Sequence, residues 1–327
     1  MQAIVLVGGE GTRLRPLTNT TPKPALTLVD RPFLAYMIEW LASHGVTEVV
    51  LACGFLPDVL QAALAGEEER AGTRIRYVVE PGPLGTAGAI RFAADALGDE
   101  LDDRFLALNG DVLTDLDLSA LLDAHEQRAA AATLGLHPVE DSSAFGLVTS
   151  GEEGRVLEFL EKTGESKPGE VNAGMYVLER SVLDLIAPGE NVSIEREVFP
   201  RLVGAGLHGL VLDGYWVDIG TPERYLQASW DILEARVRTG VRPTGPGLLV
   251  DPDAEVDDDA TVGPRAVVGP DCRVGAGAGV RESVLLAGSA VGQGARVTGS
   301  VLAPGAEIAP GAVVEGAVVA QGERVPA

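Results

Sequence analysis

The sequence predicts an α/β fold with a doubly wound, mostly parallel, Rossmann-like sheet, followed by a left-handed parallel β-helix. Up to about residue 110, short apolar runs alternate with segments of helical periodicity, which is typical of right-handed βαβ units. After residue 247, valines recur every six residues among Gly, Pro, Ala and Asp, which is typical of hexapeptide repeats around a triangular core. We therefore expect two domains, residues 1–235 and 248–327, joined by a linker at residues 236–247 that is rich in Pro and Gly.

The composition is that of an ordered globular protein, with 46% apolar and 22% charged residues. No apolar run reaches the roughly 20 residues of a membrane span, and the short N-terminal apolar stretch lacks the basic flank of a signal peptide. Cys53 and Cys272 lie far apart and are expected to be reduced, buried thiols. These features predict a cytoplasmic protein without a membrane partner. The net charge of −23 disfavours a nucleic-acid partner, because phosphate backbones bind basic surfaces.

The first element is the apolar run at residues 3–7, which we expect to be a strand buried on both faces. Three glycines and three cations follow it: Gly8, Gly9, Gly11, Arg13, Arg15 and Lys23. Bare backbone amides and clustered cations just after a strand predict a polyphosphate site. A Walker A loop is excluded because it requires a lysine directly after its second glycine. A dinucleotide fingerprint is excluded because Leu14 stands where it requires a third glycine.

Helices and strands alternate along the rest of the first domain. Helices are expected at residues 33–41, 57–64, 86–97 and 223–235, and strands at residues 46–52, 74–79 and 105–108. Between residues 130 and 211 the segments shorten, and strands at residues 145–148, 156–162 and 171–177 are expected to form a lid over the core. Because ligands bind beyond the carboxyl ends of parallel strands, the glycine-rich loop, Glu80 and Asp111 are expected to converge.

The string from Gly8 to Lys23 closely resembles the signature of sugar-1-phosphate nucleotidyltransferases, the nucleotide-sugar pyrophosphorylases. Strings at residues 80–88, 109–112, 161–162, 172–174 and 215–222 extend the resemblance over nearly the whole chain. The appended β-helix resembles the mannose-1-phosphate guanylyltransferase branch. The resemblance implies the reaction NTP + sugar 1-phosphate ⇌ NDP-sugar + pyrophosphate, with Mg²⁺ as cofactor and in-line attack on the α-phosphorus.

The resemblance also implies roles for individual residues. Asp111 and Asp218 would bind Mg²⁺, a hard cation that takes carboxylate oxygens, and Arg13 and Lys23 would complete the catalytic group. A carboxylate at Asp218, between Val217 and Ile219, would be costly without a partner. The implied sugar-phosphate residues are Gly146, Glu161, Lys162 and Asn172. The implied nucleotide-binding residues are Leu6, Gly8, Gly9, Gly11, Thr12, Arg13, Glu80, Gly85, Thr86, Ala87 and Asn109.

Some of these residues also have a purely structural interpretation. Asp111 alone could be a turn residue, and Glu161–Lys162 alone an exposed charged pair at a strand end. The family usually has proline after Glu-Lys, whereas Thr163 follows here, so the local turn is expected to differ.

Base selectivity is expected to depend on Glu80. Guanine presents two adjacent donors, N1–H and the 2-amino group, which one carboxylate can accept together. Relatives specific for thymidine or uridine nucleotides tend to carry glutamine in this segment. GTP is therefore the favoured nucleotide, and the resemblance to the mannose-1-phosphate guanylyltransferase branch implies mannose 1-phosphate as the favoured acceptor. The alternative is that backbone groups of Leu6, Gly8 and Gly85 select the base.

Other functions remain open from the sequence. One is a glucose-1-phosphate nucleotidyltransferase that uses UTP or dTTP. Another is a catalytically silent homologue that binds a nucleotide sugar and regulates a partner, although Arg13, Lys23, Asp111 and Asp218 are all present. A purely structural β-helix scaffold would leave the first 230 residues unexplained. All four histidines precede the linker, so the β-helix is expected to support homo-oligomerisation rather than acyl transfer.

Overall fold

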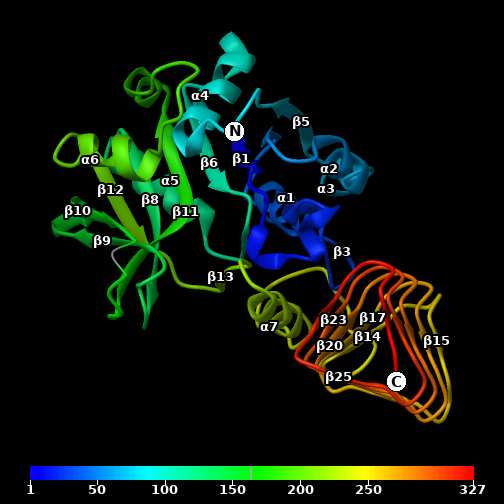
Figure 1. The fold of residues 1–327 in the computed structure, drawn as a ribbon. Helices are drawn as coiled ribbons and strands as arrows, with labels where there is room; N and C mark the ends of the chain where they lie inside the picture. The colour runs from blue at the N-terminus through cyan, green and yellow to red at the C-terminus, as the bar shows by residue number, and fades with distance from the viewer. Residues whose placement is uncertain (163) are drawn as a thin grey trace. The chain divides into compact units, whose positions relative to one another are not determined.

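The computed structural model describes residues 1–162 and 164–327 (Figure 1). The chain forms two compact units, which do not follow one another in sequence. The first comprises Met1–Gly9 and Met37–Trp216, and the second comprises Glu10–Tyr36 and Val217–Ala327. The first boundary between them therefore falls inside the glycine-rich loop. No helix in the described residues is long and apolar enough to cross a membrane.

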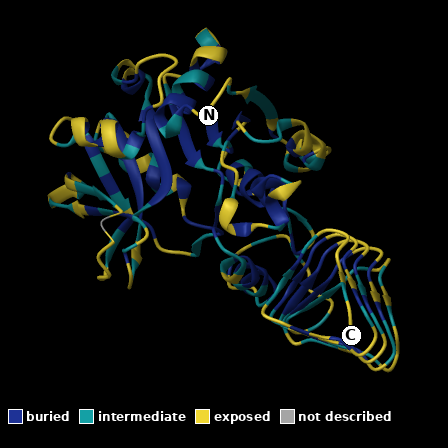
Figure 2. Cartoon of the chain, in the orientation of Figure 1, coloured by how far each residue is buried: buried dark blue, intermediate teal, exposed yellow. Residues whose placement is uncertain are grey.

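The first unit is built on a sheet that has nine strands among the described residues. Its parallel half has the order β6-β1-β4-β5, with β1 at its centre. These strands are β1 (Gln2–Leu6), β4 (Glu48–Cys53), β5 (Arg74–Val79) and β6 (Arg104–Asn109). All of β4 and most of β1 and β6 are buried, which confirms the prediction of apolar strands covered on both faces (Figure 2).

The other half of the sheet is mainly antiparallel, and the predicted lid is wrong. Strand β11 pairs antiparallel with β6, β8 and β9, β10 pairs antiparallel with β9, and β12 pairs parallel with β8. These strands are β8 (Ala132–Val139), β9 (Gly146–Ser150), β10 (Val156–Glu161), β11 (Gly169–Glu179) and β12 (Leu207–Val211). Most of β11 is buried, because it lies inside the sheet between β6 and β8 rather than above it.

Helices and short elements connect these strands. The helices are α1 (Phe33–Ser43), α2 (Pro57–Ala63), α3 (Glu67–Ala71), α4 (Gly85–Leu97), α5 (Leu118–Gln127), α6 (Phe199–Leu202) and α7 (Pro222–Leu233). The short strands are β2 (Thr27–Leu28), β3 (Arg31–Pro32), β7 (Val112–Thr114) and β13 (Trp216–Asp218). A π-helical turn, Ile194–Val198, precedes α6. Its Ile194 shares one hydrophobic core with Ile90 of α4, Ile4 of β1 and Tyr176 of β11.

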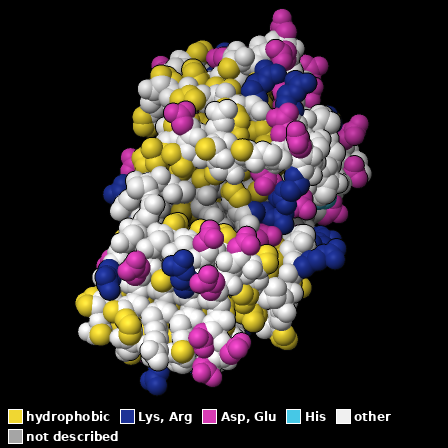
Figure 3. Space-filling view, turned by 90° about the vertical axis from the view of Figure 1, so that its right-hand side faces the viewer, with side chains coloured by type: hydrophobic (Ala, Val, Ile, Leu, Met, Phe, Trp, Pro, Cys, Tyr) yellow, Lys and Arg dark blue, Asp and Glu magenta, His cyan; other side chains and the backbone are white. Residues whose placement is uncertain are grey.

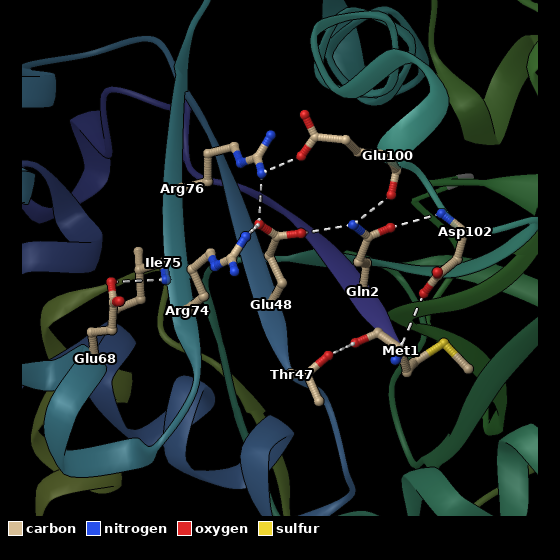
Figure 4. Close-up of polar contacts among 10 residues, drawn as sticks. All are labelled: Met1, Gln2, Thr47, Glu48, Glu68, Arg74, Ile75, Arg76, Glu100 and Asp102. Atoms are coloured by element: carbon tan, nitrogen blue, oxygen red, sulfur yellow. Dashed lines mark hydrogen bonds and ion pairs between the residues drawn. The ribbon is translucent and has the colours of Figure 1, made fainter.

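A polar network joins the amino ends of β1, β4 and β5 (Figure 4). The Glu48 carboxylate is buried and accepts a hydrogen bond from Gln2 Nε2 at 2.7 Å. Arg76 and Arg74 lie 3.0 and 3.5 Å from its other oxygen. The Gln2 side chain in turn accepts from the Asp102 backbone at 2.7 Å. Because a buried carboxylate is stable only when paired, this network fixes the edge of the sheet opposite the glycine-rich loop.

The second unit contains the β-helix. Within residues 248–327 its strands stack in three parallel sheets, in the orders β14-β17-β20-β23-β26, β15-β18-β21-β24-β27 and β16-β19-β22-β25. The strands are β14 (Leu248–Val250), β15 (Glu255–Val256), β16 (Thr261–Val262), β17 (Ala266–Val268), β18 (Arg273–Val274), β19 (Gly279–Arg281), β20 (Ser283–Leu285), β21 (Ala290–Val291), β22 (Arg296–Thr298), β23 (Val301–Leu302), β24 (Glu307–Ile308), β25 (Val313–Glu315), β26 (Val318–Val319) and β27 (Arg324–Val325).

The repeated valines fill the core of the β-helix. Val256 pairs with Val274, and Val262 pairs with Val280, so one coil takes three hexads. Val268, Val274 and Val280 lie in one buried cluster. This arrangement fits the left-handed β-helix that the hexad spacing predicts.

The β-helix, α7 and the segment Glu10–Tyr36 belong to the same unit. Arg265 donates to Glu234 at 2.6 Å and stacks 5.2 Å from the Trp230 ring of α7. Tyr225 of α7 is buried and donates its hydroxyl proton to the Thr27 carbonyl. Thr20 Oγ1 also donates to Gln321 Oε1, in the last part of the β-helix, at 2.9 Å. These contacts connect the segment Glu10–Tyr36 to the β-helix in two ways, through α7 and through the hydrogen bond from Thr20 to Gln321.

The buried side chain of His125 makes the stability of the first unit depend on pH. His125 of α5 is fully buried, with Nδ1 2.9 Å from Thr133 Oγ1 and Nε2 3.0 Å from Glu179 Oε1. Burial lowers the pKa of His125 below its ordinary value of about 6.5. The unfolded chain therefore takes up this proton first as the pH falls. The stabilisation is present above about pH 6.5 and is lost as the pH falls toward the lower pKa of the folded state.

We predict that the free energy of unfolding, measured by urea titration, falls less between about pH 8 and pH 5.5 in His125→Gln than in the wild type. The matched control is His44→Gln, because the His44 side chain lies only partly buried at the end of α1. An unchanged pH dependence in His125→Gln would contradict this prediction.

Candidate active site

The loops at the carboxyl ends of β1, β4 and β6 approach one another through their backbones. A Cβ atom on Gly54 would lie 2.9 Å from the Gly8 carbonyl oxygen. A Cβ atom on Gly110 would lie 2.6 Å from Val7 Cγ1 and 2.8 Å from the Leu6 carbonyl oxygen, which accepts from the Gly110 N–H at 2.9 Å. Only glycine fits at such separations. The structure therefore brings the loop after β1 against the loop that begins at Gly54 and the loop that leads from Gly110 to Asp111.

Glu80 follows β5 and lies beside Gly8. Its backbone N–H donates to the Cys53 carbonyl at 2.8 Å, and its Oε1 lies 3.1 Å from the position of a Cβ atom on Gly8. Burial raises the pKa of Glu80, and a hydrogen bond from the Leu84 backbone partly opposes this. Burial and the nearby Glu80 charge raise the pKa of the Cys53 thiol to about 12, so this cysteine stays protonated.

The start of α4 is directed toward residues 191–195. The Ala87 N–H donates to the Val192 carbonyl at 2.9 Å. Thr86 Oγ1 donates to Glu195 Oε2 at 2.7 Å and accepts from the Ile194 N–H at 2.8 Å. Gly85 has φ +67°, and a Cβ atom there would lie 2.6 Å from the Val192 carbonyl oxygen. Thr86 and Ala87 were expected to bind the nucleotide. The Thr86 hydroxyl and the Ala87 N–H instead form hydrogen bonds within the protein.

Asn109 ends β6 and lies against Gly174, in the part of β11 where the pairing with β8 is irregular, between Asn172 and Tyr176. A Cβ atom on Gly174, which has φ +73°, would lie 2.8 Å from Asn109 Nδ2. The Asn172 side chain accepts from the Gly174 N–H at 3.0 Å and donates to the Tyr176 hydroxyl at 2.9 Å. The structure therefore brings Asn109 of the nucleotide set together with Asn172 of the sugar set.

The charges of three carboxylates act on Tyr176. It is fully buried, and its pKa is raised well above the ordinary value of 10. Burial is the largest cause, and the negative charges of Glu195, Glu161 and Asp111 raise it further, so these three side chains lie near the phenol. The sequence reasoning missed Tyr176 and Glu195. The only signal for Tyr176 was its position two residues after Gly174.

Glu161 lies over the backbone of Gly146. A Cβ atom on Gly146 would lie 2.7 Å from Glu161 Oε2, and Lys162 Nζ lies 3.3 Å from Glu161 Oε1. The Lys162 side chain is exposed, and its backbone has φ +47°. The neighbouring Thr163 lies outside the described residues.

In the second unit, three cations surround Asp218. Lys23 is buried, with Nζ 3.3 Å from Asp218 Oδ1, and Arg224 NH1 lies 3.6 Å from Oδ2. A Cβ atom on Gly220 would lie 2.7 Å from Arg13 NH2, so the Arg13 guanidinium packs on the turn after Asp218. The sequence reasoning did not include Arg224, which it saw only as a residue in the first turn of a helix.

The residues that precede Lys23 shape this part of the site. Gly11 adopts φ +62°, and a Cβ atom there would lie 3.2 Å from Lys23 Cβ. Thr12 begins a 3-10 turn, Thr12–Leu14, and is exposed. Gly9 in the first unit has open space around the position of a Cβ atom.

The described residues were searched for groups of side chains that could hold a metal ion. No three His, Cys, Asp or Glu side chains among them could together hold a metal ion. Asp111 in the first unit and Asp218 in the second each carry a carboxylate, the type of hard oxygen ligand that Mg²⁺ takes together with water and substrate phosphates. A carboxylate is less typical of a tetrahedral zinc site, which mostly uses Cys and His.

The chain was compared with known families and proteins. A profile described as Nucleotidyl transferase matches residues 2–235, and one described as GMPPB C-terminal domain matches residues 244–326. The mannose-1-phosphate guanylyltransferase of Mycobacterium tuberculosis is 44% identical over 236 residues, covering 71% of this chain and 65% of that protein. The chain thus spans just under two thirds of that relative's length. The mannose-1-phosphate guanyltransferase of Candida albicans is 41% identical over 299 residues, covering 88% and 82%.

Solved structures share the fold of most of the chain. HddC from Yersinia pseudotuberculosis matches with a TM-score of 0.62 and 26% identity, covering 71% of this chain and 99% of that chain. A second structure of HddC, complexed with GMP-PN, matches with a TM-score of 0.61.

The close approach at Gly110 leads to a prediction about stability. We predict that Gly110→Ala destabilises the protein by about 1–3 kcal/mol, because the new methyl group meets Val7 and the Leu6 carbonyl in a packed region. The free energy of unfolding in urea measures the effect. The matched control is Gly9→Ala, which adds the same group in open space and should leave the stability nearly unchanged. Equal stabilities of the two variants would refute the steric argument.

Proposed function

The chain belongs to the nucleotidyl transferase family, and on that premise we propose that it transfers a guanylyl group from GTP to mannose 1-phosphate, giving GDP-mannose and pyrophosphate. Relatives named as mannose-1-phosphate guanylyltransferases, at 41% and 44% identity, support this choice of substrates. The observation that carries the proposal is the Glu80 carboxylate, which is held beside Gly8 at the end of β1. In doubly wound sheets, ligands bind beyond the carboxyl ends of the strands, so this position is suited to the nucleotide.

Glu80 suits guanine because its two carboxylate oxygens can accept from N1–H and the 2-amino group together. The Leu84 backbone holds the carboxylate, and the missing side chain of Gly8 leaves room for it. The amide of a UTP- or dTTP-specific enzyme would present one donor and one acceptor instead. A carboxylate at this position therefore favours GTP over the pyrimidine nucleotides.

Arg13 and Lys23 are proposed to bind the phosphates of the nucleotide. In the ligand-free chain, the Lys23 ammonium is paired with Asp218 at 3.3 Å. Incoming phosphate oxygens can take over this cation, which would leave the Asp218 carboxylate to a different partner. Mg²⁺, held by Asp111 and Asp218, would supply charge neutralisation for the reacting phosphates.

Glu161 and Asn172 are proposed to bind hydroxyls of the hexose, with Gly146 contributing backbone groups and Lys162 the charge for the sugar phosphate. A phosphate oxygen of the sugar attacks the α-phosphorus of GTP in line, the bond from the α-phosphorus to the bridging oxygen breaks, and pyrophosphate leaves. No covalent enzyme intermediate is needed, so the side chains act by positioning and by electrostatic stabilisation. We further propose that the β-helix supports self-association of the chain.

The function is tested by measuring Mg²⁺-dependent pyrophosphate release from a matrix of GTP, ATP, UTP and dTTP with several sugar 1-phosphates. We expect the highest kcat/KM for GTP with mannose 1-phosphate. Asp111→Asn should reduce turnover by at least about 100-fold, because a neutral amide binds Mg²⁺ weakly. Preference for UTP or dTTP with glucose 1-phosphate would support the alternative enzyme, and no release from any pair would support the silent homologue.

A second prediction concerns the selection of the nucleotide base by Glu80. We predict that Glu80→Gln lowers the discrimination of GTP against UTP by about 30- to 150-fold in kcat/KM. The amide replaces one acceptor by a donor that faces the donor groups of guanine, which costs about 2–3 kcal/mol. Glu69→Gln, an exposed carboxylate of α3, is the matched control. If Glu80→Gln keeps the wild-type preference, backbone groups of Leu6, Gly8 and Gly85 select the base.

A further inference from the structure

Glu195 is a carboxylate with one oxygen held by the protein and one oxygen available. It lies in the π-helical turn Ile194–Val198, a type of turn that is frequent at functional sites. Its Oε2 accepts from Thr86 Oγ1 at 2.7 Å and from Ser193 Oγ at 2.8 Å. Within residues 1–162 and 164–327, no hydrogen bond or ion pair involves its Oε1.

The two hydroxyl donors fix the direction of this carboxylate. Thr86 Oγ1 accepts from the Ile194 N–H, so its proton is left for Glu195. Ser193 Oγ likewise accepts from the Arg196 N–H at 3.3 Å, which leaves its proton for the same oxygen. The backbone around Thr86 is itself fixed, because the Ala87 N–H donates to the Val192 carbonyl. Glu195 is therefore oriented before any ligand arrives.

Glu195 belongs to the same neighbourhood as the proposed sugar residues. Among the three carboxylates whose charges raise the pKa of Tyr176, Glu195 has the largest effect, ahead of Glu161 and Asp111. The Tyr176 hydroxyl accepts from Asn172, which is a proposed hexose ligand. The ring of Tyr176 lies 5.0 Å from Phe199, the residue that follows the π-helical turn. Contacts of β11, the π-helical turn and α4 thus place Glu195 beside the sugar side of the site.

The chemistry of this neighbourhood favours a hydroxyl-rich ligand. Several carboxylates near one point repel the phosphates of a substrate, whereas a neutral polyol offers a hydroxyl proton to each of them. A carboxylate oxygen that accepts from a hydroxyl forms a charge-assisted bond, and an analogue without that hydroxyl leaves the oxygen unpaired. Such a site discriminates strongly between stereoisomers of a hexose.

We propose that Glu195 is a specificity-determining residue that accepts a hydrogen bond from one hexose hydroxyl through Oε1, and that Thr86 is its positioning residue. This inference rests on the proposed function. It assigns Thr86 to the orientation of Glu195 rather than to direct contact with the nucleotide. The loop that carries Glu80 at one end therefore also supports sugar recognition, through Thr86.

The test uses Glu195→Gln with mannose 1-phosphate and its monodeoxy analogues. In the wild type, removal of the contacted hydroxyl should raise the KM for the sugar phosphate by about 10- to 100-fold. In Glu195→Gln the KM for the parent sugar phosphate should rise by a similar factor, while the analogue that lacks this hydroxyl shows little further loss. The KM for GTP should stay within about 3-fold of the wild type, since the contact is to the sugar alone.

Two further variants separate positioning from a general structural effect. Thr86→Val keeps the branched shape and removes the donor, so it should raise the same sugar KM by a smaller factor and leave the GTP KM unchanged. Glu190→Gln makes the same chemical change at an exposed position nearby and should behave as the wild type. If Glu195→Gln does not fold, Thr86→Val and Glu195→Asp carry the test with the same deoxy analogues.

The outcomes distinguish this inference from the function on which it rests. A Glu195 variant with wild-type KM for the sugar and full sensitivity to every deoxy analogue would overturn the role of Glu195. Parallel loss for all analogues, together with a raised GTP KM, would show a structural effect and would also overturn it. A wild-type protein that releases no pyrophosphate with any NTP and sugar phosphate would instead defeat the proposed function.

Discussion

The site in the first unit depends on the contact between backbones at the carboxyl edge of the sheet. Gly54 meets the Gly8 carbonyl, and Gly110 meets the Leu6 carbonyl, at separations that exclude any side chain. The Gly110 N–H donates to the Leu6 carbonyl and the Val7 N–H to the Ala52 carbonyl, so these loops cannot move apart without losing hydrogen bonds. Glu80 is held beside Gly8 and Asn109 beside Gly174 for this reason. At the opposite edge of the sheet, the network around Glu48 fixes the amino ends of the strands. The carboxyl edge is therefore the side of the sheet that is suited to ligands.

Charged side chains are unevenly distributed over the protein. The chain carries a net charge of −23, and on the face in Figure 3 the Lys and Arg side chains lie among Asp and Glu side chains. Around Asp218, in contrast, Arg13, Lys23 and Arg224 outnumber the carboxylate. Around Tyr176 the balance is reversed, with three acidic groups near one phenol. A cluster of cations attracts phosphates, whereas carboxylates accept hydrogen bonds from hydroxyl groups, so the two surroundings differ in the ligand groups that they favour.

Local sequence patterns predicted the helices, the strands and the motif residues. Most of the features that they did not predict depend on contacts between residues far apart in the sequence. Strand β5 begins and ends at the predicted residues, and the hexads lie in the β-helix as expected, because both patterns repeat over short distances. The lid was wrong because apolar periodicity identifies a strand without identifying its partner. Thr86 was placed in the nucleotide set from its motif, yet its hydroxyl contacts a residue 109 positions later. No spacing rule within one segment could have related Thr86 to Glu195.

The inclusion of the signature segment in the β-helix unit has a consequence for how such chains can diverge. Thr20 contacts Gln321, Thr27 contacts Tyr225, and Arg265 contacts both Trp230 of α7 and Glu234, the residue that follows α7. A recombination event at the linker would exchange the partners of Thr20 and of α7 while keeping the segment that carries Arg13 and Lys23. We therefore expect that the β-helix cannot be exchanged between relatives independently of residues 10–36. Chimaeras made by joining parts of different relatives should work best when residues 10–36 and the β-helix come from the same parent.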